Sequence, residues 1–386
     1  MNLHSSAAPC IDLHTRSKHI CTCMSNSVSD SRSRAEKKIC FEPFRTALIN
    51  RIENVLSDVI KDIRAGSFPE LSNFLPSSTI NENKDEESQK KGVSFGAKLS
   101  RNKFTLMMIV LSTAHDLLIS NSTMNRRALY YKLKNEKTMH LASKQADVDK
   151  AVNWVANLLN CSPWNLHLIP TCSSLVAGDV TFNLTDNTII DCSTLGDALI
   201  PHIAFGVKSI RTKAKFVLVV EKDTVFQQLL KRNCTRILNC ILITGKGYPD
   251  MNARMLVKKL CEEMCLPTYI FVDSDPFGID IMLVYRYGSS ALARENESLA
   301  APNARWLGVF PSELRVLEAK TLPLTKYDSA KLNRLSFSFF VKEKILRELN
   351  IMWEGKAEIE SVISCFPSDF FVKLYLKCKI EGGDYI

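Results

Sequence analysis

The chain has no long hydrophobic run: none of its apolar stretches reaches the roughly 20 residues that a membrane-spanning helix needs. Its first residues also lack a compact apolar stretch followed by a cleavage site, so we expect no secretory signal. The sequence therefore predicts that no membrane is among the partners of this protein. We find no internal repeat either.

Paired cysteine motifs are missing too. The 13 cysteines are scattered and odd in number, which favours reduced thiols inside a cell over a disulfide scaffold. His14, His19, Cys21 and Cys23 lie close together, but their spacing matches no common structural zinc site. Because residues 1–39 are rich in Ser, Lys and Arg, we predict a disordered tail there and keep zinc binding as the lesser alternative.

The length and composition predict two domains behind this tail. The chain has 386 residues, of which 46% are hydrophobic, so it exceeds one small core and has enough apolar side chains for two. We place the domains at residues 40–204 and 205–386. The net charge of +9, from 50 Lys and Arg against 41 Asp and Glu, is compatible with a polyanionic partner but does not require one.

The first domain has the outline of a winged helix. Apolar residues recur at helical spacing over 43–66, 98–120 and 148–159, and a polar segment at 76–93 reads as a linker. Residues 166–184 have the pattern of a hairpin that turns at Ser173 and Ser174. Helices followed by a small hairpin are typical of the winged helix-turn-helix, which binds duplex DNA.

The second domain has the pattern of an α/β sheet. Apolar runs alternate with helical patterns, which predicts parallel strands joined by right-handed crossovers. A polar helix around 326–350 and an apolar segment at 369–376 follow. The predicted strands are 216–220, 240–244 and 268–272, and the predicted helices between them are 223–231 and 251–265.

Carboxylates end two of these strands. Glu221 follows the first predicted strand, and Asp273 and Asp275 follow the third. Because parallel strands end at one edge of a sheet, where α/β folds bind ligands, we expect the three groups to converge there. Hard oxygen ligands of this kind suit Mg²⁺. The equally weighted alternative is that these carboxylates cap helices or lie at the surface as plain charges.

A basic and aromatic cluster lies at Arg126–Lys132, with the sequence Arg-Arg-Ala-Leu-Tyr-Tyr-Lys. A phenol with a pKa of roughly 10 is a weak nucleophile, but neighbouring arginines favour its ionised form and can hold a phosphate beside it. A tyrosine in this setting could attack a phosphodiester. From these residues alone, an aromatic pair half-buried on an amphipathic helix is the favoured interpretation.

The segment Thr244–Asp250 joins a predicted strand to a predicted helix. It is not a Walker loop, because the Gly-x4-Gly-Lys-Ser/Thr spacing is absent, and we find no ATP-binding motif in the chain. Its two glycines allow backbone amides to approach a phosphate, and Lys246 adds a positive charge. A plain turn explains these residues equally well.

Together these segments resemble the meiotic DNA double-strand-break transesterases of the sporulation-eleven type, which are relatives of the topoisomerase VI A subunit. The resemblance runs from Phe95 to Ile386, with a weaker match at 45–66. Each motif is modest alone, but their order along the chain is specific. The segments that carry it are Leu117–Tyr131, Val219–Asp223, Ile243–Asp250, Val272–Ile279, Arg305–Gly308 and Pro311–Leu314.

The resemblance implies a fold and a set of site residues. It implies a winged-helix (CAP-like) domain with the catalytic tyrosine, followed by a Toprim domain, which is a Rossmann-like parallel sheet that binds Mg²⁺. By this resemblance Tyr131 is the nucleophile and Arg127 supports it. The implied Mg²⁺ ligands are Glu221, Asp273 and Asp275, and the implied DNA-binding residues are Arg126, Lys246, Tyr248 and Arg254.

The resemblance also implies the reaction. The tyrosine attacks a backbone phosphorus, displaces the 3′ oxygen and stays linked to the 5′ end. One tyrosine cuts one strand, so a double-strand break needs a homodimer on duplex DNA, with each site built from both copies. In such a type IIB topoisomerase-like enzyme, a topoisomerase VI B-like subunit handles ATP. Further expected partners are other meiotic break-forming proteins, on chromosomes in the nucleus.

The sequence departs from the family pattern at two places. Ala128 replaces the acidic residue that follows the motif arginine, and Ser173-Ser174 replaces the Lys-Gly of the wing. These departures motivate one alternative, a DNA-binding scaffold of the same fold with weak or no catalysis. The other alternative is a Toprim hydrolase, which uses the same carboxylates and needs no tyrosine.

Overall fold

The computed structural model describes residues 41–71, 92–289, 295–367 and 370–386. The predicted tail with its histidine–cysteine cluster and nearly all of the predicted linker lie outside these residues. The chain forms two compact units, which we describe separately. The first comprises residues up to Leu71 together with Val93–Ser122, and most of the second is Thr123–Ile386.

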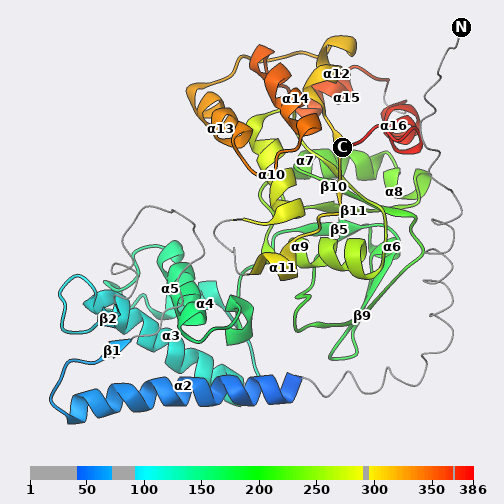
Figure 1. Ribbon diagram of the computed structural model, residues 1–386. Helices are drawn as coiled ribbons and strands as arrows, with labels where there is room; N and C mark the ends of the chain where they lie inside the picture. The colour runs from blue at the N-terminus through cyan, green and yellow to red at the C-terminus, as the bar shows by residue number, and fades with distance from the viewer. Residues whose placement is uncertain (1–40, 72–91, 290–294, 368–369) are drawn as a thin grey trace, which may run out of the picture. The chain divides into compact units, whose positions relative to one another are not determined.

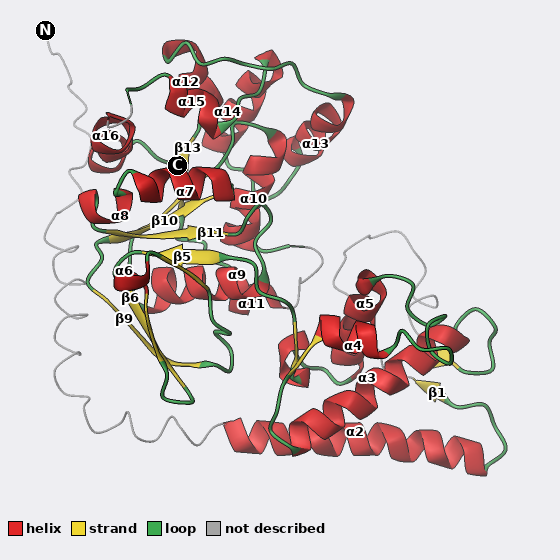
Figure 2. Ribbon diagram, turned by 180° about the vertical axis from the view of Figure 1, so that it is seen from behind, coloured by secondary structure: helices red, strands yellow, loops and turns green. Residues whose placement is uncertain are grey.

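The first unit is built on two helices, α2 (Phe41–Arg64) and α3 (Arg101–Ile119), which lie side by side in Figures 1 and 2. Both helices were predicted, and both predictions are confirmed. Their apolar residues at helical spacing meet each other, so that Leu48 and Ile52 of α2 and Met107 of α3 are almost wholly buried. A two-stranded antiparallel ladder joins β1 (Glu70–Leu71) to β2 (Val93–Ser94).

The second unit begins with the segment that carries the tyrosine pair. The short strand β3 (Met124–Asn125) leads directly into α4 (Arg126–Lys132), and α5 (Gln145–Leu158) packs against α4. The predicted helix at 148–159 is thus confirmed. A 3₁₀ turn, η3 (Pro163–Leu166), then leads to β4 (Leu168–Ile169), which pairs in parallel with β3.

The predicted hairpin over residues 166–184 is wrong. Its first half, β4, pairs with β3, whereas β5 (Leu175–Ala177) joins the central sheet antiparallel to β11 (Cys240–Thr244). Pairing with β11 gives β5 a ladder of backbone hydrogen bonds, and all three side chains of β5 are buried in the sheet. An apolar run shows that a segment pairs, but it does not identify the partner strand.

The central sheet has six strands in the order β13-β12-β10-β11-β5-β8. Figure 1 labels three neighbours among them, β10, β11 and β5. Strands β13, β12, β10 and β11 are parallel to one another, as expected for the α/β domain. Two strands from before residue 205, β5 and β8, complete it. The bounds are β8 (Asp197–Leu199), β10 (Phe216–Val220), β12 (Thr268–Phe271) and β13 (Arg305–Gly308).

The strands are apolar throughout because both faces of the sheet are covered. Along β10, Val217 and Val219 face one core, whereas Leu218 and Val220 face the other. Helix α9 (Met251–Lys258) packs on the first face, and α7 (Asp223–Lys231) packs on the second, as Figure 2 shows. The predicted α7 has the observed bounds, and the predicted helix at 251–265 is α9 continued by a π-helical turn, η4 (Lys259–Glu263).

The C-terminal helices differ from the prediction in one respect. The single helix predicted around 326–350 is two helices, α13 (Lys326–Ser336) and α14 (Glu343–Ile351). Between them the chain turns through Phe337–Lys342, so that Leu332 and Leu349 reach the same core from different helices. The apolar segment predicted at 369–376 contains the π-helical η7 (Phe371–Leu376), which runs on into α16 (Lys377–Glu381).

The remaining elements support this framework. A second, three-stranded sheet has the order β7-β6-β9. None of the helices in the described part of the chain is long and apolar enough to cross a bilayer. The other bounds are β6 (Val180–Leu184), β7 (Ile189–Asp191), β9 (Val207–Thr212), α6 (Cys192–Leu195), α8 (Cys234–Ile237), α10 (Pro276–Tyr287), α11 (Asn296–Leu299), α12 (Pro311–Val316), η6 (Met352–Glu354) and α15 (Ile359–Ser364).

Candidate active site

The three predicted carboxylates converge beyond the ends of β10 and β12. The backbone amide of Asp273 donates a hydrogen bond to Glu221 Oε2 over 3.0 Å. Asp275 is the N-cap of α10, where its Oδ1 accepts from the Gly278 amide over 2.6 Å. Asp275 therefore also plays the capping role that was the alternative prediction. The capping leaves its second oxygen for other ligands.

The pKa values of the three carboxyl groups are all raised. Burial, followed by repulsion from Asp273, raises the pKa of Glu221 to about 8. Burial also raises the pKa of Asp273 to about 6 and raises that of Asp275. Three neighbouring acids with raised pKa values, of which Asp273 is buried and the other two are half-buried, are a group that a divalent cation would stabilise.

Lys222 is the cation that the cluster already contains. Its Nζ lies 3.0 Å from Asp273 Oδ2, 3.2 Å from a Glu358 carboxylate oxygen and 3.3 Å from one of Glu360. Burial lowers the pKa of this lysine, but the hydrogen bond and the charge of Asp273 outweigh that effect and raise it overall. The sequence analysis did not identify Lys222 as a partner of the triad.

A C-terminal segment, Lys356–Glu360, is fastened to the acidic loop. Ser274 and Ala357 exchange two backbone hydrogen bonds, and the Ile359 amide donates to Asp273 Oδ1 over 2.9 Å. Lys356 is in turn paired with Asp328 over 2.7 Å. Ile359 follows Asp273 by 86 positions, and no pattern in the sequence points to the role of this segment.

The residues present fit a Mg²⁺ ion. The donor set consists of carboxylate oxygens, and the close packing around it requires a glycine: a Cβ at Gly278 would overlap the Asp273 carbonyl and lie 3.1 Å from Glu221 Oε2. Within the described ranges, however, no three metal-ligating side chains are already arranged around one point. The ion pair between Lys222 and Asp273 occupies one of the carboxylate oxygens.

The two tyrosines, Tyr130 and Tyr131, have different surroundings. Tyr130 donates its hydroxyl to the Ser143 carbonyl over 3.2 Å, and the Lys134 ammonium lies 4.7 Å from its ring centroid. Tyr131 is 59% exposed, and its hydroxyl lies 3.4 Å from an Arg127 guanidinium nitrogen. Asn125 caps α4 by accepting from the Arg127 amide over 2.8 Å. The second tyrosine is therefore the one that is presented to solvent, with the arginine beside it.

Comparison with known proteins identifies the family of this chain. Residues 216–380 match the Toprim-domain family of the topoisomerase 6 A subunit and Spo11, and residues 102–168 match the family described as Type IIB DNA topoisomerase. The chain is 34% identical over 358 residues to the meiotic recombination protein SPO11 of Homo sapiens, covering 87% of each chain. The chain belongs to the topoisomerase VI A/Spo11 family.

Other members of the topoisomerase VI A/Spo11 family are similar over comparable lengths. The meiotic recombination protein SPO11 of Mus musculus is 32% identical over 355 residues, which cover 88% of each chain. The A subunit of DNA topoisomerase 6 from Arabidopsis thaliana is 30% identical over 302 residues, which cover 76% of this chain and 69% of that protein.

Two of the DNA-binding residues expected from the family lie at the surface. Tyr248 is 51% exposed, and its hydroxyl donates to Asp280 over 2.5 Å. Lys246 has a left-handed backbone, with φ of 56°, and its ammonium lies 3.2 Å from an Asp223 carboxylate oxygen. Both belong to the loop between β11 and α9 that was considered as a phosphate-binding turn.

The other two lie inside the domain. Arg126 is 8% exposed, donates to the Leu168 carbonyl over 3.0 Å and pairs with Asp149. Arg254 is 2% exposed, and burial lowers its pKa to about 10. Packing covers both side chains in this structure, and their role in DNA binding stays a prediction.

The predicted wing turn at Ser173 and Ser174 contacts Asp250, the N-cap of α9. The backbone amides of Ser173 and Ser174 donate to Asp250 Oδ2 over 3.0 and 3.3 Å. The other oxygen of Asp250 caps α9 by accepting from Ala253. The backbone of these serines therefore fastens the start of β5 to the N-cap of α9.

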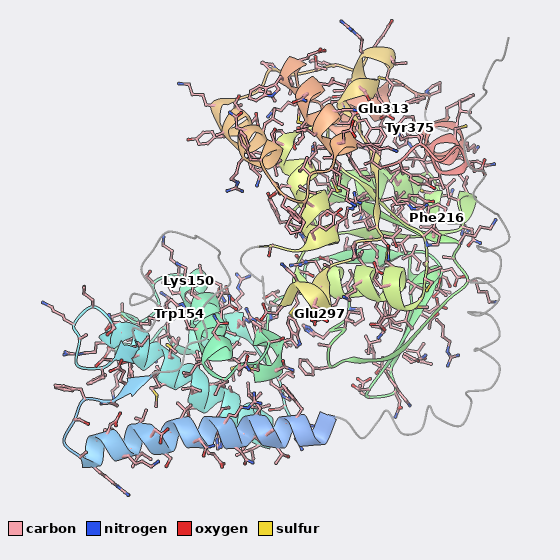
Figure 3. All side chains as sticks on the ribbon, viewed as in Figure 1. Lys150, Trp154, Phe216, Glu297, Glu313 and Tyr375 are labelled. Carbon is pink, nitrogen blue, oxygen red and sulfur yellow. The ribbon has the colours of Figure 1, made fainter. Side chains whose placement is uncertain are left out.

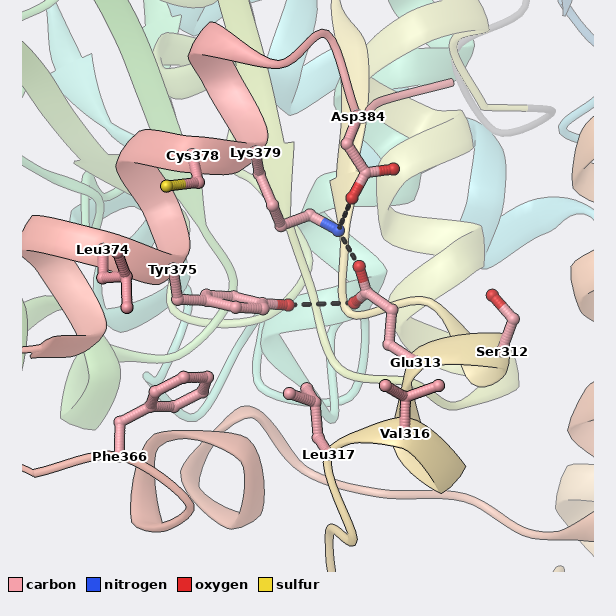
Figure 4. Close-up of a pocket in the computed structure, with 10 residues that line it drawn as sticks. All are labelled: Ser312, Glu313, Val316, Leu317, Phe366, Leu374, Tyr375, Cys378, Lys379 and Asp384. Atoms are coloured by element: carbon pink, nitrogen blue, oxygen red, sulfur yellow. Dashed lines mark hydrogen bonds and ion pairs between the residues drawn. The ribbon is translucent and has the colours of Figure 1, made fainter.

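A separate pocket of about 560 Å³ lies between α12, η7 and α16. Figure 3 shows Glu313 and Tyr375 close together in this part of the domain, and Figure 4 shows the pocket. Lys379 is 5% exposed and pairs with Glu313 and with Asp384, while Tyr375 donates to Glu313 over 2.9 Å. The Pro311–Leu314 signature of the family thus includes an internal ion-pair network.

Proposed function

We propose that this protein is a topoisomerase-like transesterase that makes DNA double-strand breaks at the start of meiotic recombination. Two observations support the proposal: relatives at 32% and 34% identity are named meiotic recombination protein SPO11, and the family's tyrosine is exposed beside an arginine. The second observation carries the chemistry, because a transesterase needs a nucleophile that DNA can reach.

In the proposed step the Tyr131 oxygen attacks a backbone phosphorus. The bond between phosphorus and the 3′ oxygen breaks, the phenol proton ends on that oxygen, and the tyrosine becomes esterified to the 5′ phosphate. One phosphoester replaces another, so cleavage itself consumes no nucleotide. Arg127, 3.4 Å from the hydroxyl, is placed to bind a non-bridging phosphate oxygen and to stabilise the phenolate.

Glu221, Asp273 and Asp275 would hold the Mg²⁺ ion of the Toprim domain. Bound there, the ion supplies positive charge to the phosphate and the leaving oxygen. The chain's own contribution is to keep the three carboxylates together: the Asp273 amide holds Glu221, the α10 N-cap holds Asp275, and the Ile359 amide holds Asp273. In the family each site combines the tyrosine of one copy with the carboxylates of the other.

Lys246 and Tyr248 form the proposed DNA-facing loop of the Toprim domain. Their exposure supports contact with phosphate and with bases; Arg126 and Arg254 are the other two proposed DNA-binding residues, and both are buried in this structure. The proposed division is a winged-helix domain with the tyrosine at 40–204 and a Toprim domain at 205–386. Two strands of the first segment, β5 and β8, cross this boundary and join the Toprim sheet, and the wing hairpin of the first segment is not formed.

The proposed partners follow from the reaction. Two copies of the chain are needed to cut both strands of duplex DNA, and a two-fold dimer suits the pseudo-symmetry of the duplex. A topoisomerase VI B-like subunit would supply the ATP-dependent step, and other meiotic break-forming proteins would act with it. The site of action would be chromosomes in the nucleus.

The test compares Tyr131→Phe with Tyr130→Phe. We expect Tyr131→Phe to abolish the covalent protein–DNA adduct on denaturing gels while DNA binding stays unchanged. Tyr130→Phe removes only the hydrogen bond to Ser143 and should leave most of the adduct. Adduct from the Tyr131→Phe protein would refute the assignment.

Two outcomes of the same experiment would favour the alternatives. DNA binding by the native chain with its partner and Mg²⁺, but with no adduct, would indicate a scaffold. Metal-dependent cleavage that survives in Tyr131→Phe would indicate a Toprim hydrolase.

A further inference from the structure

Lys222 pairs with the oxygen of Asp273 that does not accept the hydrogen bond from the Ile359 amide. Asp273 Oδ1 accepts from the Ile359 amide over 2.9 Å, whereas Oδ2 lies 3.0 Å from the Lys222 ammonium. Because Asp273 is 3% exposed, water has little access to either oxygen. A metal ion that uses this carboxylate as a ligand must therefore compete with the ammonium group.

The same ammonium has a second place to bind. Glu358 and Glu360 lie 3.2 and 3.3 Å from Lys222 Nζ, and their side chains are 58% and 30% exposed. Glu360 is held in position because its other oxygen accepts from the Thr224 hydroxyl over 2.8 Å. The lysine can thus move away from Asp273 by a small rotation and keep two carboxylate partners.

We propose that Lys222 is a built-in counter-cation that competes with Mg²⁺ for Asp273 and is received by Glu358 and Glu360 when the ion binds. This inference rests on the proposed function of the triad as a metal site. Without metal, the ammonium offsets the repulsion among Glu221, Asp273 and Asp275. With metal, two cations beside one carboxylate would repel each other, so the lysine shifts to the C-terminal segment.

Removing the lysine and removing its two glutamate partners should change Mg²⁺ affinity in opposite directions. Lys222→Met removes the competitor and should tighten Mg²⁺ binding. The double substitution Glu358→Gln with Glu360→Gln removes the alternative partners, keeps the lysine on Asp273 and should weaken binding. We expect changes of about 5- to 10-fold in each direction, at the lower end of coupling between two ligands that share a group.

The experiment is a calorimetric titration of the full-length protein with MgCl₂ in the absence of DNA. Lys259→Met serves as the matched control, because that lysine pairs with Glu263 on η4 instead of with the triad. Thermal unfolding without metal gives a second readout: Lys222→Met should unfold at a lower temperature than the native chain, and saturating Mg²⁺ should restore it. Lys222→Gln replaces Lys222→Met if the methionine variant does not fold.

Each outcome decides one of the two proposals. Equal affinities in the native chain, the lysine variant and the double variant would overturn the counter-cation and leave the metal site standing. Failure of both the native chain and the lysine variant to bind Mg²⁺ would overturn the metal site itself, and the counter-cation with it. Binding by the lysine variant alone would support the competition strongly.

Discussion

The amide of Asp273 donates to the carboxylate of Glu221 over 3.0 Å, so one member of the acidic triad braces the backbone of the next. The bond ties the end of β10 to the loop after β12, two strands that are already neighbours in the sheet. It also holds two acids close together in a buried place. The consequences of that proximity can be measured.

The stability of the metal-free protein should fall as the pH rises from about 5 to about 8. Burial and mutual repulsion raise the pKa of Glu221 to about 8, well above its value of 4.5 in an unfolded chain. The folded state therefore holds a proton that the unfolded state has released, and stability falls with pH wherever that is so. At about 1.4 kcal/mol for each pKa unit, a shift from 4.5 to about 8 corresponds to a loss on the order of 5 kcal/mol.

Urea unfolding at a series of pH values measures this fall. In Glu221→Gln the fall should be smaller, because the amide cannot titrate, and saturating Mg²⁺ should reduce it in the native chain. A flat profile, or a variant that falls as steeply as the native chain, would show that Glu221 does not dominate the pH dependence.

Gly278→Ala should disrupt the acidic loop. The added methyl group would overlap the Asp273 carbonyl and approach Glu221 Oε2, the oxygen that accepts from the Asp273 amide. We expect a loss of stability of about 1–3 kcal/mol from this overpacking and a loss of Mg²⁺ binding. Both are measured on the purified chain by urea unfolding and calorimetry.

Gly196→Ala is the matched control for that substitution. Gly196 has a φ of 87° and open space around its Cβ position, so alanine there introduces backbone strain without crowding. It should cost about 1 kcal/mol of stability and leave Mg²⁺ binding intact. Loss of binding in both variants would mean that general destabilisation, rather than the crowded loop, is responsible.

Tyr248→Ala should weaken DNA binding without affecting the fold. The side chain is half-exposed, and a base stacked on an aromatic ring contributes about 1–3 kcal/mol, which corresponds to roughly 5- to 150-fold in the dissociation constant. Tyr248→Phe keeps the ring and loses only the hydrogen bond to Asp280, so it should bind nearly as well. Fluorescence anisotropy with labelled duplex DNA measures both. Unchanged binding in Tyr248→Ala would remove this residue from the DNA surface.

Glu313→Gln should destabilise the domain by about 3 kcal/mol, because it leaves the buried Lys379 ammonium without its better-covered partner. Its other partner, Asp384, is 60% exposed and remains. Combining Glu313→Gln with Lys379→Met should recover most of the loss, since no buried charge is then unpaired. Urea unfolding measures all three proteins.

The exposed pair of Glu343 and Arg347 on α14 is the control for this network. Its side chains are 78% and 71% exposed, so Glu343→Gln should cost less than about 0.5 kcal/mol. Equal losses for Glu313→Gln and Glu343→Gln would contradict the importance of burial at the pocket.

Local pattern predicted the elements that the sheet needs. Strands β10 and β11 and helix α7 have the predicted bounds, because a strand buried on both faces is a continuous apolar run and the helix that follows has one apolar face. Their parallel direction also follows from the alternation of strand and helix. The placement of the three carboxylates at one edge of the sheet could be predicted for the same reason, because parallel strands end at one edge, whereas their role as metal ligands stays a prediction.

Long-range choices could not be predicted in this way. Strand β5 pairs with β11 rather than with β4, although its own sequence suits either partner. The break between α13 and α14 depends on the core that both helices share. The burial of Arg126 and Arg254 is likewise a property of what packs over them. The resemblance to the family implies that both arginines bind DNA, and that role stays a prediction.

By itself, the amino-acid sequence determined which residues form the sheet, which carboxylates lie at its edge and which tyrosine pair follows the arginines, since these depend on residues close together in the chain. Only the tertiary structure decided that Lys222 and the amide of Ile359 divide Asp273 between them. Ile359 lies 86 residues after Asp273, so no local pattern in the sequence predicts their contact. The packing of the folded chain brings the two residues together.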